Sequence, residues 1–476
     1  MTALIRKPHT PGGFREMFAI AVPMIVSSAC ETVMTFTDRL FLAHLGPAQM
    51  NAASAGGLTA FMFTTFVLGL TGYSTAIVAQ YLGAGRKDRC GVAVFQALLL
   101  CICAYPFILA CRPLGHALFD YAGIVPEQRV PQKQFFDILL FGTIIGLVRN
   151  CLSSYFSGIG RTRIVMLSAL TAMVVNVVAN YILVFGKFGV PALGIRGSAI
   201  GTIIGGSCGL LVVAAGYFGK RNRTEFHVLQ TFRYDREVMR KLLRFGSPAG
   251  WEFFLNLLAF DILILMFHSR GLEAATAVTV VFNWDMVSFV PLMGVNIGVT
   301  SLVGRYMGAG DPATAHRAAI SGLKLAWSYG LCTLITFSCF PEPLVNVFRP
   351  AGDDELFARA APVAIFMLRL CSLYVLADAT NLVFSGALRG AGDTLWAMTI
   401  SVGLHWFLVA VLATMLRGFN VSVEMAWGAL VAVIWVFTAL FYMRYRGGKW
   451  RNIRLIAPEE RAPILPTDGL HETADM

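Results

Sequence analysis

The sequence predicts an all-α membrane protein in which twelve transmembrane helices form two six-helix lobes, related by a parallel pseudo-two-fold repeat. Of its 476 residues, 57% are hydrophobic and only 14% are charged, whereas soluble proteins carry about 25% charged residues. The pentapeptide Tyr81–Gly85 returns with one change as Tyr306–Gly310, and at the same offset of 225 residues Pro23 returns as Pro248. Long apolar segments and an internal duplication are together typical of secondary transporters.

Mostly apolar stretches follow one another along the chain, each long enough as a helix to cross about 30 Å of hydrocarbon. The twelve stretches cover residues 16–38, 52–80, 91–111, 135–157, 164–185, 197–218, 242–268, 275–303, 319–340, 362–387, 394–416 and 424–443. Six of them fall in each copy. Because six is an even number, the second copy enters the membrane in the same orientation as the first, which predicts a parallel repeat.

Composition also divides the chain into parts, because a segment rich in Lys and Arg separates the sixth stretch from the seventh. We expect a cytoplasmic N-terminus (1–15), an N-lobe (16–218), a cytoplasmic linker (219–241), a C-lobe (242–445) and a cytoplasmic tail (446–476). The tail mixes prolines with charged residues, so we expect it to be partly disordered.

The distribution of Lys and Arg predicts the orientation in the membrane. The termini, the linker and alternate loops carry more than twice as many of these residues as the other loops. The positive-inside rule therefore places both termini in the cytoplasm. This bias toward anionic lipid headgroups accounts for much of the net charge of +11, so we expect contacts with the lipid bilayer and no nucleic acid partner. We further expect a monomer in the inner membrane of a bacterium.

Local motifs of soluble enzymes do not occur in this sequence. It contains no Gly-x-x-x-x-Gly-Lys-Ser/Thr loop, no Gly-x-Gly-x-x-Gly after a strand and no His-Glu-x-x-His. The ten cysteines show no spacing typical of a metal site. We therefore expect a protein that is not an enzyme and has no cofactor, and any transport would draw its energy from an ion gradient.

Carboxylates inside the apolar stretches are the first candidates for function, because an Asp at a helix centre costs about 2.5 to 3.5 kcal/mol even on the lenient insertion scale. Such a residue needs a partner or a purpose. The candidates are Glu31, Asp38, Asp137, Glu252, Asp261, Asp285 and Asp378. Asp137 lies near the end of its stretch and is expected at the interface, whereas Asp378 lies deep within the tenth stretch.

Polar residues around Asp378 form a stripe on one helical face. Tyr374, Asp378, Asn381 and Ser385 follow one another at spacings of four, three and four residues. One interpretation is a hydrogen-bonded seam between helices. The other is a cation or proton site, since carboxylate, phenol and amide oxygens are hard ligands of the kind that Na⁺ or a protonated amine binds.

A second group of polar residues is expected in the first half. Asn176 and Asn180 lie four residues apart on the fifth stretch, and Asp38 and Glu31 lie on one face of the first. Oxygen-bearing side chains converging on a carboxylate would form a small cation pocket, whereas Asn pairs can also join helices without binding an ion. Arg149, inside the fourth stretch, and Arg369, inside the tenth, are both expected to pair with carboxylates.

Several motifs together resemble the multidrug and toxic compound extrusion (MATE) family of transporters, bacterial type. Residues 384–394 are similar to its Gly-Ala-Leu-Arg-Gly-Ala-Gly-Asp-Thr signature, and residues 156–162 resemble a degenerate first-half counterpart. Pro23 with residues 38–46 resembles the first helix of the family, and residues 176–186 resemble its Asn-x-x-x-Asn-Tyr fifth helix. The resemblance covers roughly residues 15–445.

The resemblance implies an antiporter that exports lipophilic, often cationic, drug-like molecules in exchange for Na⁺ or H⁺ by alternating access. It implies cation or proton binding by two groups: Asp38, Asn176, Asn180 and Thr202 in the first lobe, with Na⁺ at the first three, and Tyr374 and Asp378 in the second. Substrate-path candidates are Glu31, Glu252, Asn256 and Asn381. A branch of the family has a glutamate eight residues after the seventh-helix proline, where this chain has Asn256.

Two other functions remain open at this point. A related transporter class flips lipid-linked sugars and needs a strongly basic cavity to hold a diphosphate. This chain has only four basic residues within or at the edges of its stretches, Arg149, Arg244, Lys324 and Arg369. A membrane sensor or scaffold without transport would tolerate Asp38→Asn and Asp378→Asn.

Overall fold

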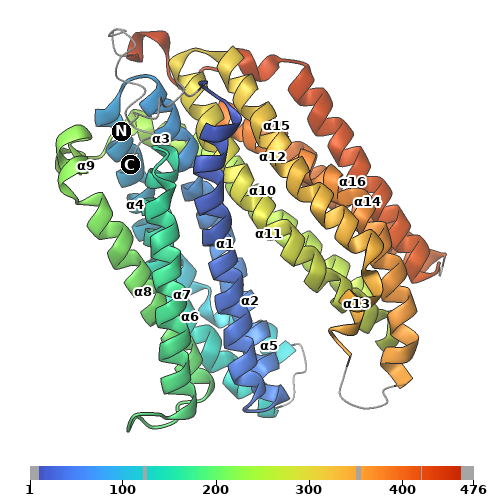
Figure 1. Ribbon diagram of the computed structural model, residues 1–476. Helices are drawn as coiled ribbons and strands as arrows, with labels where there is room; N and C mark the ends of the chain where they lie inside the picture. The colour runs from blue at the N-terminus through green and yellow to red at the C-terminus, as the bar shows by residue number, and fades with distance from the viewer. Residues whose placement is uncertain (1–9, 122–125, 350–354, 420, 462–476) are drawn as a thin grey trace, which may run out of the picture. The chain divides into compact units, whose positions relative to one another are not determined.

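The computed structural model describes residues 10–121, 126–349, 355–419 and 421–461, and within them every regular element is a helix (Figure 1). The first half contains α1 (Phe14–Ala43), α2 (Pro47–Gly72), α3 (Ser74–Gly83), α4 (Lys87–Ala110), α5 (Arg112–Tyr121), α6 (Pro126–Gly158), α7 (Thr162–Phe185), α8 (Ile195–Tyr217) and the short α9 (Lys220–Glu225). The second half contains α10 (Arg236–His268), α11 (Leu272–Ala309), α12 (Pro312–Cys339), the short α13 (Pro341–Asn346), α14 (Glu355–Ala391), α15 (Thr394–Ala413) and α16 (Val423–Arg446).

The described residues contain twelve helical segments that are long and apolar enough to span a membrane, as the sequence predicts. The second segment joins α2 to α3 and the third joins α4 to α5, so two of the expected spans are interrupted helices. Short 3₁₀-helices η1 (Val228–Gln230), η3 (Lys449–Asn452) and η4 (Pro458–Glu460) and a π-helical segment η2 (Thr414–Gly418) complete the fold. The first nine residues and the part of the expected disordered tail from residue 462 onward lie outside the described residues.

The duplicated Gly-Ala-Gly turns are helix stops with the same backbone geometry. Gly85 has a φ of 75° and Gly310 a φ of 80°, values that favour glycine because a side chain crowds the left-handed conformation. In both copies the residue after the turn donates to the tyrosine carbonyl at 2.9 Å, Arg86 to Tyr81 and Asp311 to Tyr306. The duplication is therefore present in the backbone structure as well as in the amino-acid sequence.

The chain forms two compact units whose boundaries cut through α1 and α10. One unit contains residues 26–82 and 86–258, and the other contains residues up to Ile25, residues 83–85 and residues from Ala259 onward. The two compact units therefore do not coincide with the two copies of the sequence. The first turns of α1 pack with the second copy, and the first half of α10 packs with the first copy.

Close helix packing accounts for both of these crossings. In one unit, a Cβ added to Gly294 of α11 would lie 2.5 Å from Ile25 N of α1. In the other, a Cβ added to Gly69 of α2 would lie 2.6 Å from Ala249 O of α10. Gly69 and Gly294 are 225 residues apart, so the same small residue in each copy admits the backbone of the helix that crosses to it.

Candidate functional site

Three helices of one unit bring a carboxylate, two amides and a hydroxyl together. Thr202 Oγ1 of α8 donates to Asp38 Oδ2 of α1 at 3.2 Å, and Asn180 Nδ2 of α7 donates to Asp38 Oδ1. Asn176 Nδ2 donates to Thr202 Oγ1 at 3.3 Å and also interacts with the Asp38 carboxylate. The convergence expected from sequence on Asp38, Asn176 and Asn180 is therefore present, and Thr202 joins it.

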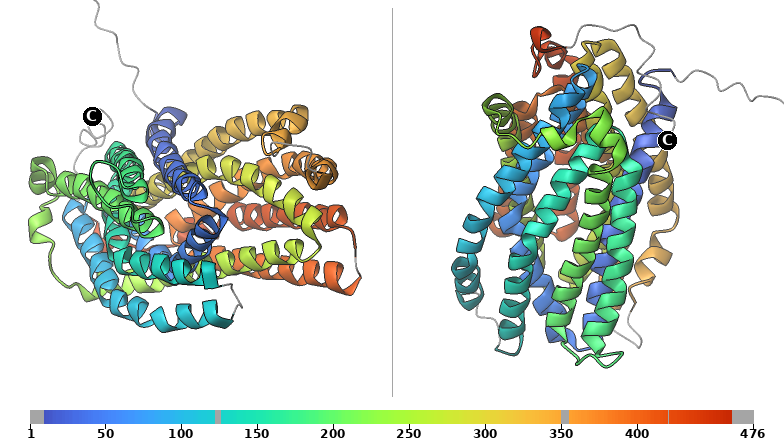
Figure 2. Two further views of the ribbon diagram at one scale, coloured as in Figure 1. Left: turned by 90° about the horizontal axis from the view of Figure 1, so that it is seen from below. Right: turned by 90° about the vertical axis from the view of Figure 1, so that its left-hand side faces the viewer.

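A row of glycines allows α8 to approach α7 closely enough for these contacts. Gly197, Gly201, Gly205 and Gly209 recur every four residues and face α7; α7 and α8 lie side by side in Figures 1 and 2. A Cβ at Gly205 would lie 2.6 Å from Ala172 O. This row is not among the features predicted above, although repeated small-xxx-small spacing is a known signal of close packing between membrane helices.

The ligand chemistry of this group suits a small monovalent cation or a proton. The two amides are fully buried, with 0% of Asn176 and 0% of Asn180 exposed. Their Oδ1 atoms have no hydrogen-bond partner in the structure. Among the described residues no group of three or more His, Cys, Asp or Glu side chains could hold a metal ion, so one carboxylate with neutral oxygens is the arrangement available here.

Glu31 has a different partner from Asp38. Its carboxylate accepts a hydrogen bond from Arg149 Nη2 of α6 at 2.9 Å, and 55% of its side chain is exposed. The ion pair expected for Arg149 is thus present. Asp137, which the sequence predicts at the interface, has two partners, Arg112 Nη2 at 2.7 Å and His116 Nε2 at 2.8 Å.

A second polar group lies in the other unit, between α11 and α14. Tyr374 OH donates to Asp285 Oδ1 at 2.7 Å. Asp378 accepts a hydrogen bond from Asn381, one turn further along α14, and interacts electrostatically with Asp285. The expected stripe on α14 therefore meets a second carboxylate. The sequence identifies Asp285 as a carboxylate within an apolar stretch. Its contact with Tyr374 could not be predicted from spacing, because the two residues lie on different helices.

Glu252 and Asn256 belong to the part of α10 that packs with the first copy. Both precede residue 259 and therefore lie in the unit that contains Asp38. Glu252 is buried, with 3% of its surface exposed. Beside it, the ring of Trp251 packs against that of Phe66 of α2, with centroids 5.0 Å apart. These two substrate-path candidates thus lie in a different unit from Tyr374 and Asp378.

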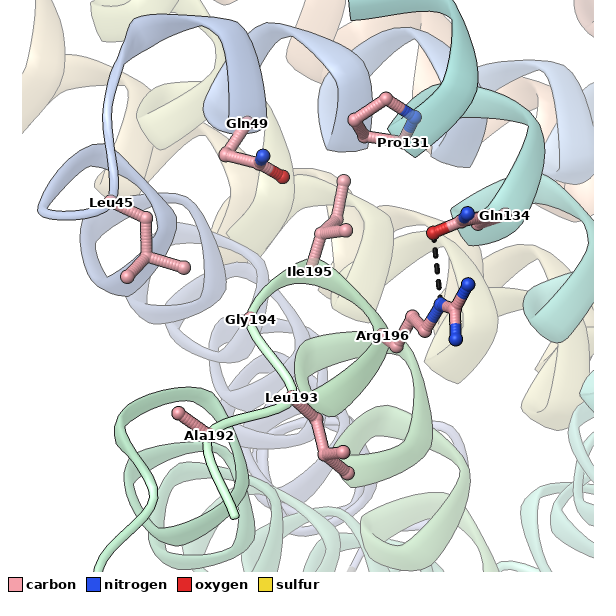
Figure 3. A pocket seen from close by; sticks show the side chains of 9 residues that line it. All are labelled: Leu45, Gln49, Pro131, Gln134, Ala192, Leu193, Gly194, Ile195 and Arg196. Atoms are coloured by element: carbon pink, nitrogen blue, oxygen red, sulfur yellow. Dashed lines mark hydrogen bonds between the residues drawn. The ribbon is translucent and has the colours of Figure 1, made fainter.

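A separate cavity lies among the ends of α1, α2, α6 and α8 (Figure 3). Its lining residues are Leu45, Gln49, Pro131, Gln134, Ala192, Leu193, Gly194, Ile195 and Arg196. Arg196 Nε donates to Gln134 Oε1 at 2.9 Å across this cavity. Its lining has a cation and no carboxylate, so it does not have the chemistry of a cation site.

Comparison with known proteins agrees with the duplicated architecture. The MatE family model matches residues 23–182 and 248–415, two segments whose first residues are the two prolines 225 positions apart. The chain is 25% identical over 466 residues to the probable multidrug resistance protein NorM of Thermotoga maritima, covering 96% of this chain and 97% of that protein. It is 24% identical over 396 residues to the multidrug resistance protein MdtK of Yersinia pseudotuberculosis, covering 83% and 85%.

Solved structures share the fold. A MOP superfamily transporter from Pyrococcus furiosus aligns with a TM-score of 0.84 at 19% identity, covering 94% of this chain and 100% of that one. A multidrug resistance MATE family transporter in an outward-facing conformation aligns with a TM-score of 0.82 at 20% identity, covering 92% and 96%. At these identities the likeness concerns the fold alone.

Proposed function

Because the chain belongs to the MatE family, with one family match in each half, we propose that it is a secondary active multidrug efflux antiporter. It exports lipophilic, often cationic compounds in exchange for Na⁺ or H⁺ by alternating access. The multidrug resistance proteins to which it is similar over 96% and 83% of its length support the substrate class. The twelve apolar helices supply the membrane setting that such a transporter requires.

The Asp38 group is the observation that carries the proposed ion coupling. A carboxylate with two amides and a hydroxyl around it can bind a proton or a Na⁺ ion, and either ion neutralises the charge of the carboxylate while it is bound. An ion that binds one conformation better than another shifts the equilibrium between them, and a drug that prefers the other conformation is then released. A membrane potential of 100 mV contributes about 2.3 kcal/mol for each elementary charge moved.

The second group, Tyr374, Asp378 and Asp285, is proposed as a further cation or proton site. Two carboxylates that interact electrostatically repel each other when both are ionised, which favours a bound cation or proton near them. Asn381 belongs to the same group. We also propose that both termini are cytoplasmic, because of the Lys and Arg bias, and that the protein works as a monomer in a bacterial inner membrane.

The test is ion-driven efflux from proteoliposomes that contain the full chain. Ethidium export is measured with an inward Na⁺ gradient and, separately, with an inward H⁺ gradient. We expect Asp38→Asn to abolish export driven by the coupling ion and Asp378→Asn to reduce it. Asp120→Asn is the matched control, because Asp120 has an exposed side chain and pairs with Lys133 at 2.7 Å. Export of no cationic dye under either gradient would sink the proposal.

The lipid-linked sugar alternative is weaker. Of the few basic residues near the spans, Arg149 is neutralised by Glu31, so the basic surface needed for a diphosphate is smaller still. A sensor or scaffold would export no dye in the wild type or in either Asp→Asn variant, and the same assay therefore separates it from the proposed antiporter.

A further inference from the structure

We propose that Gly201 is a positioning residue that decides whether the Asp38 group can bind Na⁺ rather than only a proton. This inference rests on the proposed ion coupling and goes beyond it, because it assigns the choice of ion to one residue. Gly201 belongs to the glycine row of α8 and precedes Thr202, which donates to Asp38 Oδ2 at 3.2 Å.

Gly201 differs from the other glycines of the row in what lies opposite it. A Cβ at Gly197 would first meet the α7 backbone, 2.7 Å from Leu183 C, and a Cβ at Gly205 would lie 2.6 Å from Ala172 O. A Cβ at Gly201 would instead meet the end of a side chain, the Oδ1 atom of Asn180. At Gly205 the nearest side-chain atom is the Cβ of Asn176, at 2.7 Å, whereas at Gly201 it is an atom of the amide group that contacts Asp38.

The Asn180 amide lies between Gly201 and the carboxylate. Its Nδ2 donates to Asp38 Oδ1, and its Oδ1 faces Gly201 without a hydrogen-bond partner. The residue is 0% exposed, so the amide cannot move out into solvent. One end of the amide therefore contacts Asp38, and the other end occupies the space beside Gly201.

The orientation of this amide matters for Na⁺ and not for a proton. An amide that presents N–H to Asp38 stabilises a bare carboxylate, whereas Na⁺ binds oxygen atoms. Turning the amide about its Cβ–Cγ bond brings Oδ1 toward Asp38 and carries the NH₂ group to Gly201. A Cβ at Gly201 would overlap the place that Oδ1 occupies now and that the NH₂ group occupies after the turn, so it would push the amide away and remove the oxygen that Na⁺ needs. A proton binds the carboxylate itself and needs no such turn.

The experiment compares two couplings in the full chain, reconstituted in proteoliposomes. The half-saturating Na⁺ concentration for ethidium export is measured at pH 8, and export driven by a pH gradient is measured without Na⁺. We expect Gly201→Ala to raise the half-saturating Na⁺ concentration by about 10- to 100-fold, as when groups that orient metal ligands are changed. Proton-driven export is expected to stay within about twofold. Gly206→Ala is the matched control on α8, because a Cβ there meets only Ile145 Cγ2 at 3.8 Å.

A double-mutant cycle shows whether Gly201 acts through Asn180. In the Asn180→Ala background, adding Gly201→Ala should change the Na⁺ requirement by less than about twofold, because the group that it displaces is gone. Folding of each variant is checked by gel filtration and thermal melting in detergent. If Gly201→Ala alone does not fold, the Asn180→Ala single variant and the double variant still make the comparison.

Four results would overturn this inference. They are no effect of Na⁺ on the wild type, equal loss of both couplings in Gly201→Ala, an undiminished effect of Gly201→Ala in the Asn180→Ala background, and failure of the double variant to fold when Asn180→Ala alone folds. None of them overturns the proposed antiporter, which fails instead if the wild type exports no dye under either gradient.

Discussion

The two copies of the chain keep the same backbone at the turn that follows α6 and α14 but place opposite charges there. After α6, Arg161 N donates to Phe156 O at 2.8 Å, and after α14, Asp393 N donates to Leu388 O at the same distance. When the sequences of the two turns are aligned, Arg161 takes the position of Asp393. The two copies thus share the main-chain geometry of this turn but differ in the sign of the side-chain charge.

The partners of these two residues have changed sign as well. Arg161 Nη2 pairs with Glu225 at 2.8 Å in one unit, and Asp393 Oδ2 pairs with Arg444 Nε at 2.7 Å in the other. In each case the turn is joined to a residue near the end of its own copy. Each copy thus has an ion pair that joins this turn to a later residue, with the positive charge on opposite sides of the pair.

A second pair of equivalent contacts follows the same rule. Glu16 of α1 accepts a hydrogen bond from Tyr306 OH at 2.7 Å. At an offset of 225 residues, Lys241 of α10 has its Nζ 5.6 Å from the centre of the Tyr81 ring. The tyrosine uses its hydroxyl toward the anion and its ring face toward the cation, so one residue type accommodates both charges.

Breaking the more deeply buried ion pair should have the largest effect on stability. Asp393 is 4% exposed, and its removal in Asp393→Ala leaves the Arg444 guanidinium without its carboxylate. Loss of one partner of a buried pair costs about 3 to 5 kcal/mol. We expect the thermal melting temperature in detergent to fall clearly more than in Arg161→Ala, because the partner that remains there, Glu225, is 31% exposed. Equal shifts would mean that burial does not distinguish the copies.

Exchanging the charges within one copy tests whether the sign matters. The double variant Asp393→Arg with Arg444→Asp gives the turn of the second copy the polarity of the turn in the first copy. We expect it to recover at least half of the melting temperature lost in Asp393→Arg alone, since the ion pair is restored. A double variant no more stable than the single one would show that the polarity of this pair is fixed by its surroundings.

The tyrosine contacts should give a smaller difference. Glu16→Ala removes an acceptor used by both Tyr306 OH and Gly12 N, at a cost of about 1.5 to 3 kcal/mol for hydrogen bonds to a charged group. Lys241→Ala removes a cation from the face of Tyr81, at a cost of about 0.5 to 1 kcal/mol. Melting of the two variants side by side checks this order, and the reverse order would contradict the comparison.

Acid should reveal the smallest effect, at Glu225. Burial alone would raise the pKa of this carboxyl, but hydrogen bonding from Arg221 and the charge of Arg161 hold the pKa below its usual value of 4.5. Because the pKa is lowered in the folded protein, the stabilisation is complete above pH 4.5 and is lost as the pH falls below it. Melting curves from pH 6 downward should therefore show a steeper loss for the wild type than for Glu225→Gln. Parallel curves would contradict this assignment.

Patterns along the chain were enough to predict the spans, the duplicated turns and the Asp38 group. Asn176 and Asn180 share a helical face because they are four residues apart. The free-energy cost of a carboxylate within the membrane means that Asp38 needs polar partners, so both observations predicted a polar group at Asp38. The link between Asp285 and Tyr374 could not be predicted in this way, because it depends on how α11 packs on α14. The same holds for the crossings of α1 and α10, since their apolar faces do not specify which copy they contact.

The exchanged first helices bear on the ancestry of the chain. A single copy on its own would have presented the first turns of its leading helix with no matching surface in the same molecule, because in each copy that surface is contributed by the other one. Two identical subunits that traded these turns would have satisfied each other, as in a domain-swapped dimer. The present chain has the organisation that fusion of such a dimer into one chain would produce, and one chain can carry opposite charges at matching positions, which two identical subunits cannot.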